Sequence, residues 1–119
     1  MSIIAIRGAI TVEQNNKADI AKNTKELIQK IEKENNIEKD KVISIIFSVT
    51  KDLNADYPAK TARELGYIHS GLMCFNEMEV SNSLRKCIRV MILYNEETSQ
   101  SNVKHVYLKE AKVLRPDLS

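Results

Sequence analysis

Residues 73–94, MCFNEMEVSNSLRKCIRVMILY, place two charged side chains in apolar surroundings. Glu77 follows the apolar run 72–75, and Arg89 interrupts a second run that is rich in β-branched residues. The second run is too short to span a membrane, so both segments are typical of strands. We interpret the rest of the chain as a scaffold that positions these two charged side chains.

Hydrophobic periodicity, helix caps and turn residues predict the remaining elements. In chain order we expect a strand over 2–12, a helix from the N-cap Asn16 to about 35–36, a strand over 41–50, a short helix from Pro58 to about 65, and strands over 70–79, 85–94 and 103–114. This order predicts one α+β domain over residues 1–119, with a mixed sheet of about five strands and one long helix on one face. The other face also carries apolar residues, so we expect a cyclic homo-oligomer to bury it.

Arg89 has two interpretations. Side chains alternate along a strand, so Arg89 shares a face with Cys87, Met91 and Leu93. Its guanidinium then either extends to water from an edge strand or lines a pocket, and on this strand alone the first is favoured. Arg7 repeats the arrangement in the first strand. Gly8, which follows it, permits either a bulge or the close approach of a neighbouring backbone or ligand.

The composition is that of an ordinary globular protein. The 119 residues are 43% hydrophobic and 29% charged, and a net charge of +2 does not favour nucleic acid as a partner. The first residues contain neither a signal peptide nor a transmembrane segment, which predicts a cytoplasmic protein without membrane contact. Cys74 and Cys87 are therefore expected to be reduced, with a disulfide as the less favoured alternative. A zinc site of these two with His69 and His105 would lack any close-spaced ligand pair.

The polar residues in and near the strands indicate binding of a small polyanion. They are Arg7, Glu77, Arg89, Tyr107 and Cys74, with Lys60 and Arg63 on the short helix. We find no Ser-His-Asp order, Gly-rich phosphate loop or catalytic carboxylate pair, so nucleophilic chemistry is not indicated. Arginines would bind carboxylates, while a carboxylate such as that of Glu77 would accept a hydrogen bond from a ligand hydroxyl.

Five sequence blocks, in order, resemble one enzyme family. They are IRGAITVE (6–13), DLNADYPAKTAREL (52–65), CFNEMEV (74–80), KCIRVM (86–91) and HVYLKEAKVLRPDL (105–118), and together they resemble the monofunctional, non-helical class of chorismate mutases. The resemblance implies homotrimers that form a pseudo-α/β-barrel, with active sites in the clefts between subunits. It also implies conversion of chorismate to prephenate in aromatic amino-acid biosynthesis, without cofactor or metal.

The resemblance also implies residue roles. Arg7 would bind the carboxylate side of the substrate, Arg89 would face the ether oxygen, and Glu77 would accept from the ring hydroxyl. The other expected substrate-binding residues are Cys74 beside that hydroxyl, Tyr107 at a carboxylate, Tyr57, Lys60 and Arg63 on a mobile loop and helix, Met73, and Leu114 and Arg115 over the mouth of the cleft.

The implied reaction is an intramolecular Claisen rearrangement without proton transfer. It needs a compact substrate conformation and stabilisation of charge that grows on the ether oxygen. We therefore expect no bell-shaped pH profile between about pH 5.5 and 8.5, since no His protonation state is used. The alternative is a trimeric metabolite-binding or imine-processing protein with an Arg-anchored carboxylate ligand, which would have no need of Glu77.

Overall fold

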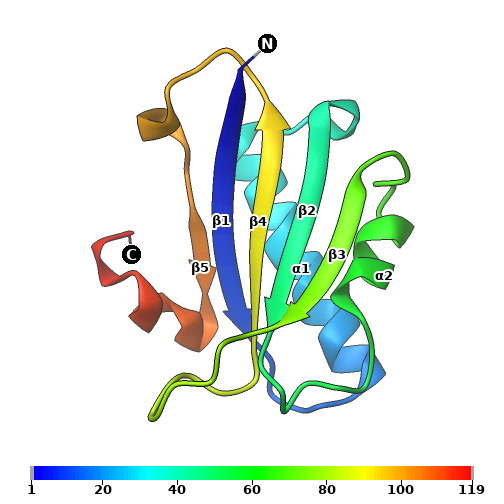
Figure 1. Cartoon of the computed structure of the whole chain (residues 1–119), viewed down its shortest axis with the longest axis vertical. Helices are drawn as coiled ribbons and strands as arrows, with labels where there is room; N and C mark the ends of the chain where they lie inside the picture. Colours follow the sequence, from blue (N-terminus) through cyan, green and yellow to red (C-terminus); the bar gives the residue numbers. More distant parts are fainter. Residues whose placement is uncertain (1, 119) are drawn as a thin grey trace.

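A five-stranded mixed sheet with strand order β3-β2-β4-β1-β5 forms the centre of the computed structural model, which describes residues 2–118 (Figure 1). The strands are β1 (Ile3–Thr11), β2 (Val42–Val49), β3 (Gly71–Asn76), β4 (Cys87–Asn95) and β5 (Val106–Leu108). The α-helices are α1 (Lys17–Asn35) and α2 (Pro58–Glu64), and the 3₁₀ helices are η1 (Lys39–Lys41), η2 (Gln100–Asn102), η3 (Lys109–Leu114) and η4 (Pro116–Leu118). β4 is antiparallel to both of its neighbours, whereas β3 and β5 are parallel to theirs, which confirms the predicted α+β class with a mixed sheet.

Helix α1 begins and ends as its sequence predicts. The Asn16 side chain accepts a hydrogen bond from the Asp19 backbone N–H at 2.7 Å, which satisfies one of the unpaired donors of the first turn. At the other end Asn36 adopts the left-handed conformation, with φ of 52°, that terminates many helices. Figure 1 shows α1 behind the sheet, where its apolar stripe packs against the strands. The predicted helix-covered face is therefore confirmed.

The main core lies between α1 and the sheet. Its largest fully buried members include Ile6, Ile10, Phe47, Ile88 and Ile92, which alternate with residues of the opposite face along their strands. Gly8 belongs to the same face, and a Cβ atom there would lie 2.6 Å from the Val106 carbonyl oxygen. Of the two interpretations of Gly8, the close approach of a neighbouring backbone is thus confirmed.

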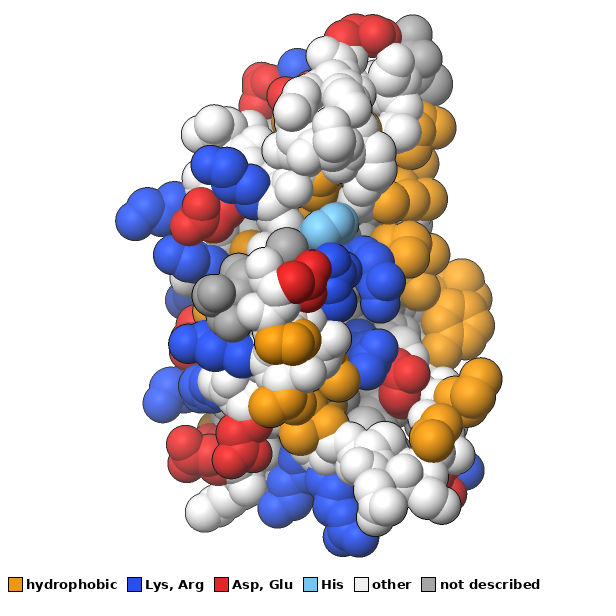
Figure 2. All heavy atoms as spheres, turned by 90° about the vertical axis from the view of Figure 1, so that its left-hand side faces the viewer, with side chains coloured by type: hydrophobic (Ala, Val, Ile, Leu, Met, Phe, Trp, Pro, Cys, Tyr) orange, Lys and Arg blue, Asp and Glu red, His pale blue; other side chains and the backbone are white. Residues whose placement is uncertain are grey.

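The other sheet face carries exposed apolar side chains. Ile3 and Met73 are each 56% exposed, Phe75 is 50% exposed, and Ile43 and Met91 are also exposed. Figure 2 shows hydrophobic side chains along its right-hand side, which is this face seen edge-on. A single copy therefore leaves an apolar surface of the kind that marks a contact site. No helix within residues 2–118 is long and apolar enough to cross a membrane.

Three predicted strands have wrong boundaries. The predicted strand 70–79 ends at Asn76, so Glu77 lies in the following loop, and the strand predicted at 85–94 begins only at Cys87. The predicted strand 103–114 is reduced to Val106–Leu108, because Lys109 takes a left-handed conformation with φ of 55° and the chain continues as η3. Its ammonium group bonds the buried Asn23 of α1, which holds this turn against the helix.

Candidate active site

Strand register brings several of the predicted residues together on the uncovered face. Ser48, Arg89, Ala9 and Tyr107 are paired in one row from β2 through β4 and β1 to β5. Arg7 lies in the next row of the same face, opposite Met91. The arginines predicted to act together therefore point to one side of the sheet.

Arg89 and Glu77 form the charged centre of this face. The Nε atom of Arg89 lies 3.6 Å from Oε1 of Glu77, and the Ser48 hydroxyl donates to the same oxygen at 2.7 Å. The side chains of Arg89 and Glu77 are 34% and 25% exposed. Although Glu77 lies outside β3, its backbone N–H still donates to the Val49 carbonyl at 2.9 Å, which keeps it beside β2. Among the described residues both contacts of this carboxylate use Oε1, so Oε2 can accept from a ligand.

An apolar floor lies beside the charged pair. Ala9, Cys87 and Ala111 are buried together, and Leu84, Tyr107 and Leu114 pack against them. Burial raises the pKa of the Cys87 thiol to about 11, with the Arg89 charge acting in the opposite direction, so the thiol is protonated at neutral pH and is a poor nucleophile. A cleft of about 710 Å³ opens here, and its lining includes Arg89, Glu77, Cys87, Thr50 and Leu114.

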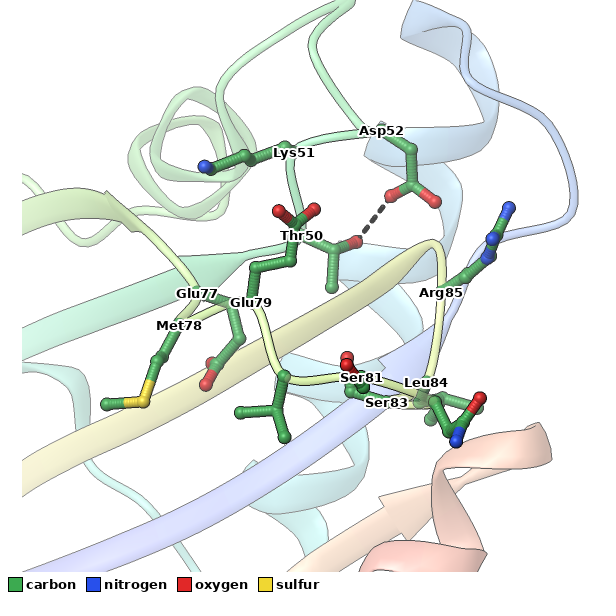
Figure 3. A pocket seen from close by; sticks show the side chains of 12 residues that line it. Thr50, Lys51, Asp52, Glu77, Met78, Glu79, Ser81, Ser83, Leu84 and Arg85 are labelled. Carbon is green, nitrogen blue, oxygen red and sulfur yellow. Dashed lines mark hydrogen bonds between the residues drawn. The ribbon is translucent and has the colours of Figure 1, made fainter.

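The loop between β3 and β4 forms one wall of this cleft. The carboxylate of Asp52 accepts from the Thr50 hydroxyl at 2.6 Å and from the Lys86 backbone N–H at 3.0 Å. Figure 3 shows Thr50 and Asp52 at the end of β2, facing the loop that carries Glu77 to Arg85. Lys86 has a positive φ of 47°, so Asp52 holds the Lys86 end of the loop in a conformation that the backbone alone does not favour.

The chain segment after η3 adds an arginine that is paired with a carboxylate of the same segment. Arg115 forms a two-bond pair with Asp117, with Nε at 3.1 Å from Oδ1 and Nη2 at 2.9 Å from Oδ2. Arg115 also interacts with Tyr107. Leu114 thus lines the cleft and Arg115 lies beside Tyr107 on the β5 side of the sheet, while their contact with substrate stays a prediction.

The other predicted residues lie at the opposite edge of the sheet. Tyr57 precedes α2 and is 69% exposed, Lys60 and Arg63 are exposed on α2, and Met73 is exposed on β3. Cys74 faces α2 from β3, packs against the main core, and has its thiol pKa raised by burial. A second cleft of about 420 Å³ has Tyr57 and Cys74 in its lining. Within one chain the structure therefore does not bring Cys74 beside Arg89.

The two cysteines lie on opposite faces of the sheet and are both free. This excludes a disulfide between Cys74 and Cys87 within one chain. No three His, Cys, Asp or Glu side chains of residues 2–118 gather in a geometry that could hold a metal ion. The four residues considered for zinc are therefore not brought together.

Sequence reasoning missed two contacts of the site. Ser48 was not singled out, although its position in β2 pairs it with Arg89 once the register is known. His105 was considered only as a metal ligand, yet its Nδ1 accepts a hydrogen bond from the Arg7 backbone N–H at 2.9 Å. The alternation of β2 could have identified the face of Ser48, whereas nothing in the sequence indicates the role of His105.

Known proteins similar to this chain are chorismate mutases. Residues 3–118 match the family described as chorismate mutase type I. The curated chorismate mutases AroH of Bacillus subtilis and of Thermus thermophilus are each 44% identical, over 100% and 95% of this chain and 94% and 93% of their own lengths. The solved structure of a chorismate mutase from Clostridium thermocellum has a TM-score of 0.89 and 49% identity, covering 92% of this chain and 97% of its own. With a match across nearly its whole length, the chain belongs to the chorismate mutase type I family.

Proposed function

We propose that this chain converts chorismate to prephenate by an intramolecular Claisen rearrangement in aromatic amino-acid biosynthesis. The observation that carries the proposal is the Arg89–Glu77 pair, held by Ser48 beside an apolar floor with no activated nucleophile among its described residues. Family membership supports it, since the similar proteins are named chorismate mutases. For the same reason the alternative of a metabolite-binding or imine-processing protein is not favoured.

The proposed mechanism uses fixed charges and no proton transfer. Arg89 faces the ether oxygen, where negative charge grows as the carbon–oxygen bond breaks, so its attraction is stronger in the transition state than in the bound substrate. Glu77 accepts from the ring hydroxyl, and Arg7 and Tyr107 bind the carboxylate side. These contacts hold the compact substrate conformation in which the two reacting carbons meet.

We further propose that two chains of a homotrimer complete each site. The α2 edge of one copy, with Tyr57, Lys60, Arg63, Met73 and Cys74, would close the cleft that contains Arg89 of another copy. Two features support this. The exposed apolar sheet face needs burial, and the two groups of predicted residues lie at opposite edges of one sheet.

The basic test is loss of chorismate absorbance in the presence of protein without added metal or cofactor. Absence of activity would contradict the proposed reaction. Light scattering tests the assembly separately, and a monomer or dimer mass at micromolar concentration would contradict the trimer.

Mixing two defective variants tests whether the site is shared between chains. Arg89→Gln damages the sheet side, and Arg63→Ala damages the α2 side. When the two are co-expressed and mix at random, about a quarter of the sites in a trimer combine two intact sides from different chains. At chorismate concentrations well below KM, activity should then exceed that of either variant alone. A mixture no more active than the average of the two variants would show that one chain supplies the whole site.

A further inference from the structure

The outer edge of β1 is completed partly by side chains. The backbone pairing of β1 with β5 begins only at Gly8, opposite Val106. Before that point the Gln100 amide bonds both backbone groups of Ala5, donating to its oxygen at 2.6 Å and accepting from its nitrogen at 2.9 Å. At Arg7 the imidazole of His105 takes this place and accepts from the backbone N–H at 2.9 Å. The backbone of a site arginine is thus held by a titratable ring.

This hydrogen bond requires a neutral imidazole. Nδ1 can accept only while it carries no proton, because both ring nitrogens of an imidazolium are donors. The ring is half-buried, and two cations act on it, Arg7 from β1 and Arg115 from the segment after η3, where Asp117 pairs with Arg115. Figure 2 faces this edge and shows a histidine beside Lys and Arg side chains. Burial, Arg115 and Arg7 together lower the pKa of His105, which favours the neutral ring.

We propose that neutral His105 is a positioning residue for Arg7, and that its protonation releases the Arg7 backbone and weakens substrate binding. The proposal rests on the function proposed above, in which Arg7 binds the carboxylate side of chorismate. An imidazolium would turn a donor toward the Arg7 N–H and add a third cation to the pair already present. The edge of β1 would then separate from His105 and displace the Arg7 guanidinium from the substrate.

The effect should appear in KM more than in kcat, because Arg89 on the central strand β4 does not depend on this contact. The chemistry alone predicts that activity is constant over a range of pH. Protonation of His105 should shorten that pH range at its acid end.

Two substitutions at His105 separate the effect of its hydrogen-bond acceptor from the effect of the charge that the ring gains on protonation. In His105→Asn, Oδ1 takes the position of Nδ1 and accepts from Arg7 without titrating. His105→Leu keeps apolar bulk and removes the acceptor. The matched control is His69→Asn, which replaces the other histidine, exposed in the loop before β3.

Steady-state kinetics on chorismate from pH 5 to 8 give distinct expectations. At pH 8 the Asn variant should retain KM within about threefold of the parent, while the Leu variant should raise KM about tenfold, as for loss of one backbone partner. On lowering the pH, KM of the parent and of His69→Asn should rise, and KM of His105→Asn should rise less. The same acid rise in the parent and in His105→Asn, or parent-like kinetics in His105→Leu, would overturn the proposal.

Nuclear magnetic resonance tests the contact without any activity. The Arg7 amide proton shift should follow the titration of His105 in the parent and in His69→Asn, and this response should be lost in His105→Asn. An Arg7 shift that is insensitive to His105 would overturn the positioning role even if the protein is active. A parent that leaves chorismate unchanged but shows the coupled titration would contradict the proposed function while the contact stands.

Discussion

The Arg89 side of the sheet and the α2 edge differ in how firmly they hold their charges. Arg89 lies on β4, which has a strand on each side, and its guanidinium is beside Glu77. The α2 edge has a helix of seven residues whose cations lie in water, and the exposed Lys60 ammonium is 3.6 Å from the half-buried Asp56 carboxylate. A surface ion pair of this kind contributes little to stability.

This difference suggests a division of labour. A charge that stabilises a transition state must be in place before the reaction, which a central strand provides. A charge that closes over the substrate must be able to move, and a short helix on an edge permits this. The C-terminal side of α2 is nevertheless anchored, because the buried Tyr67 donates its hydroxyl proton to Glu32 of α1.

The largest expected effect is on turnover, from Arg89→Gln. Glutamine keeps hydrogen-bonding capacity but removes the positive charge from the proposed oxyanion contact. A preorganised donor at such a position is worth about 3–4 kcal/mol, or two to three orders of magnitude in rate, so kcat should fall by about that factor. Steady-state kinetics measure it, after circular dichroism has confirmed folding.

The matched control is Lys33→Gln, which removes a cation from the last turn of α1, far from the cleft, and should leave kcat unchanged. Lysine at position 89 should restore activity only in part, because it lacks the planar guanidinium. If Arg89→Gln kept kcat within about threefold of the parent, Arg89 would be only a solvated charge on the sheet.

The second effect is on stability of the Arg7 side, from Gly8→Ala. The added Cβ would lie 2.6 Å from the Val106 backbone oxygen and 3.1 Å from Ile31 of α1, so β5 must move away from β1. Overpacking of this kind costs about 1–3 kcal/mol, and chemical denaturation should show that loss. Because β5 carries Tyr107, KM should rise as well. An alanine variant as stable as the parent would mean that β5 can shift away from β1 without loss of stability.

The third effect is on binding, from Arg63→Ala. The exposed guanidinium on α2 is expected to reach substrate only when the edge closes, so its loss should raise KM about tenfold and change kcat less. The comparison with Arg89→Gln is the measurement that counts. If Arg63→Ala lowered kcat as much as Arg89→Gln does, the proposed difference in role between the fixed and the mobile charges would be contradicted.

Alternation predicted much of the Arg89 side from the sequence. Period-two alternation grouped Arg89 with Cys87, Met91 and Leu93 on one face, and the pairing of β1 with β4 shows that Arg7 shares this face, which lies away from α1. Glu77 was placed on a strand because it follows an apolar run, but only its backbone contact to Val49 continues the pairing. Alternation along a strand does not predict the orientation of a side chain that lies just past the end of that strand.

The β5 side could not be predicted because its geometry depends on distant contacts. Lys109 ends β5 in a conformation that sequence patterns reserve for glycine or asparagine, and its bond to Asn23 spans most of the chain. The α2 edge was predicted as a helix with two cations, but its place at the far edge of the sheet follows from strand order. Strand order is not encoded in local pattern.

The smallest expected effect is a dependence of stability on pH that is caused by the titration of His105. An unperturbed histidine has a pKa of about 6.5, and the pKa of His105 in the folded chain is lowered by burial and by Arg115 and Arg7. Between these two values the unfolded chain binds more protons than the folded chain, so the free energy of unfolding rises with pH. The stability that neutral His105 contributes is therefore complete above the unfolded value and is lost as pH falls toward the folded value.

Urea midpoints measured from pH 7.5 to 5.5 at one protein concentration should fall more for the parent than for His105→Asn, because asparagine does not titrate. The carboxylates with lowered pKa values, including Asp56 and Asp117, respond at lower pH and contribute equally to both proteins. The difference between the two curves thus isolates His105. Parallel curves would mean that the ring gains its proton without loss of the Arg7 contact, and the acid end of the activity profile would then need another cause.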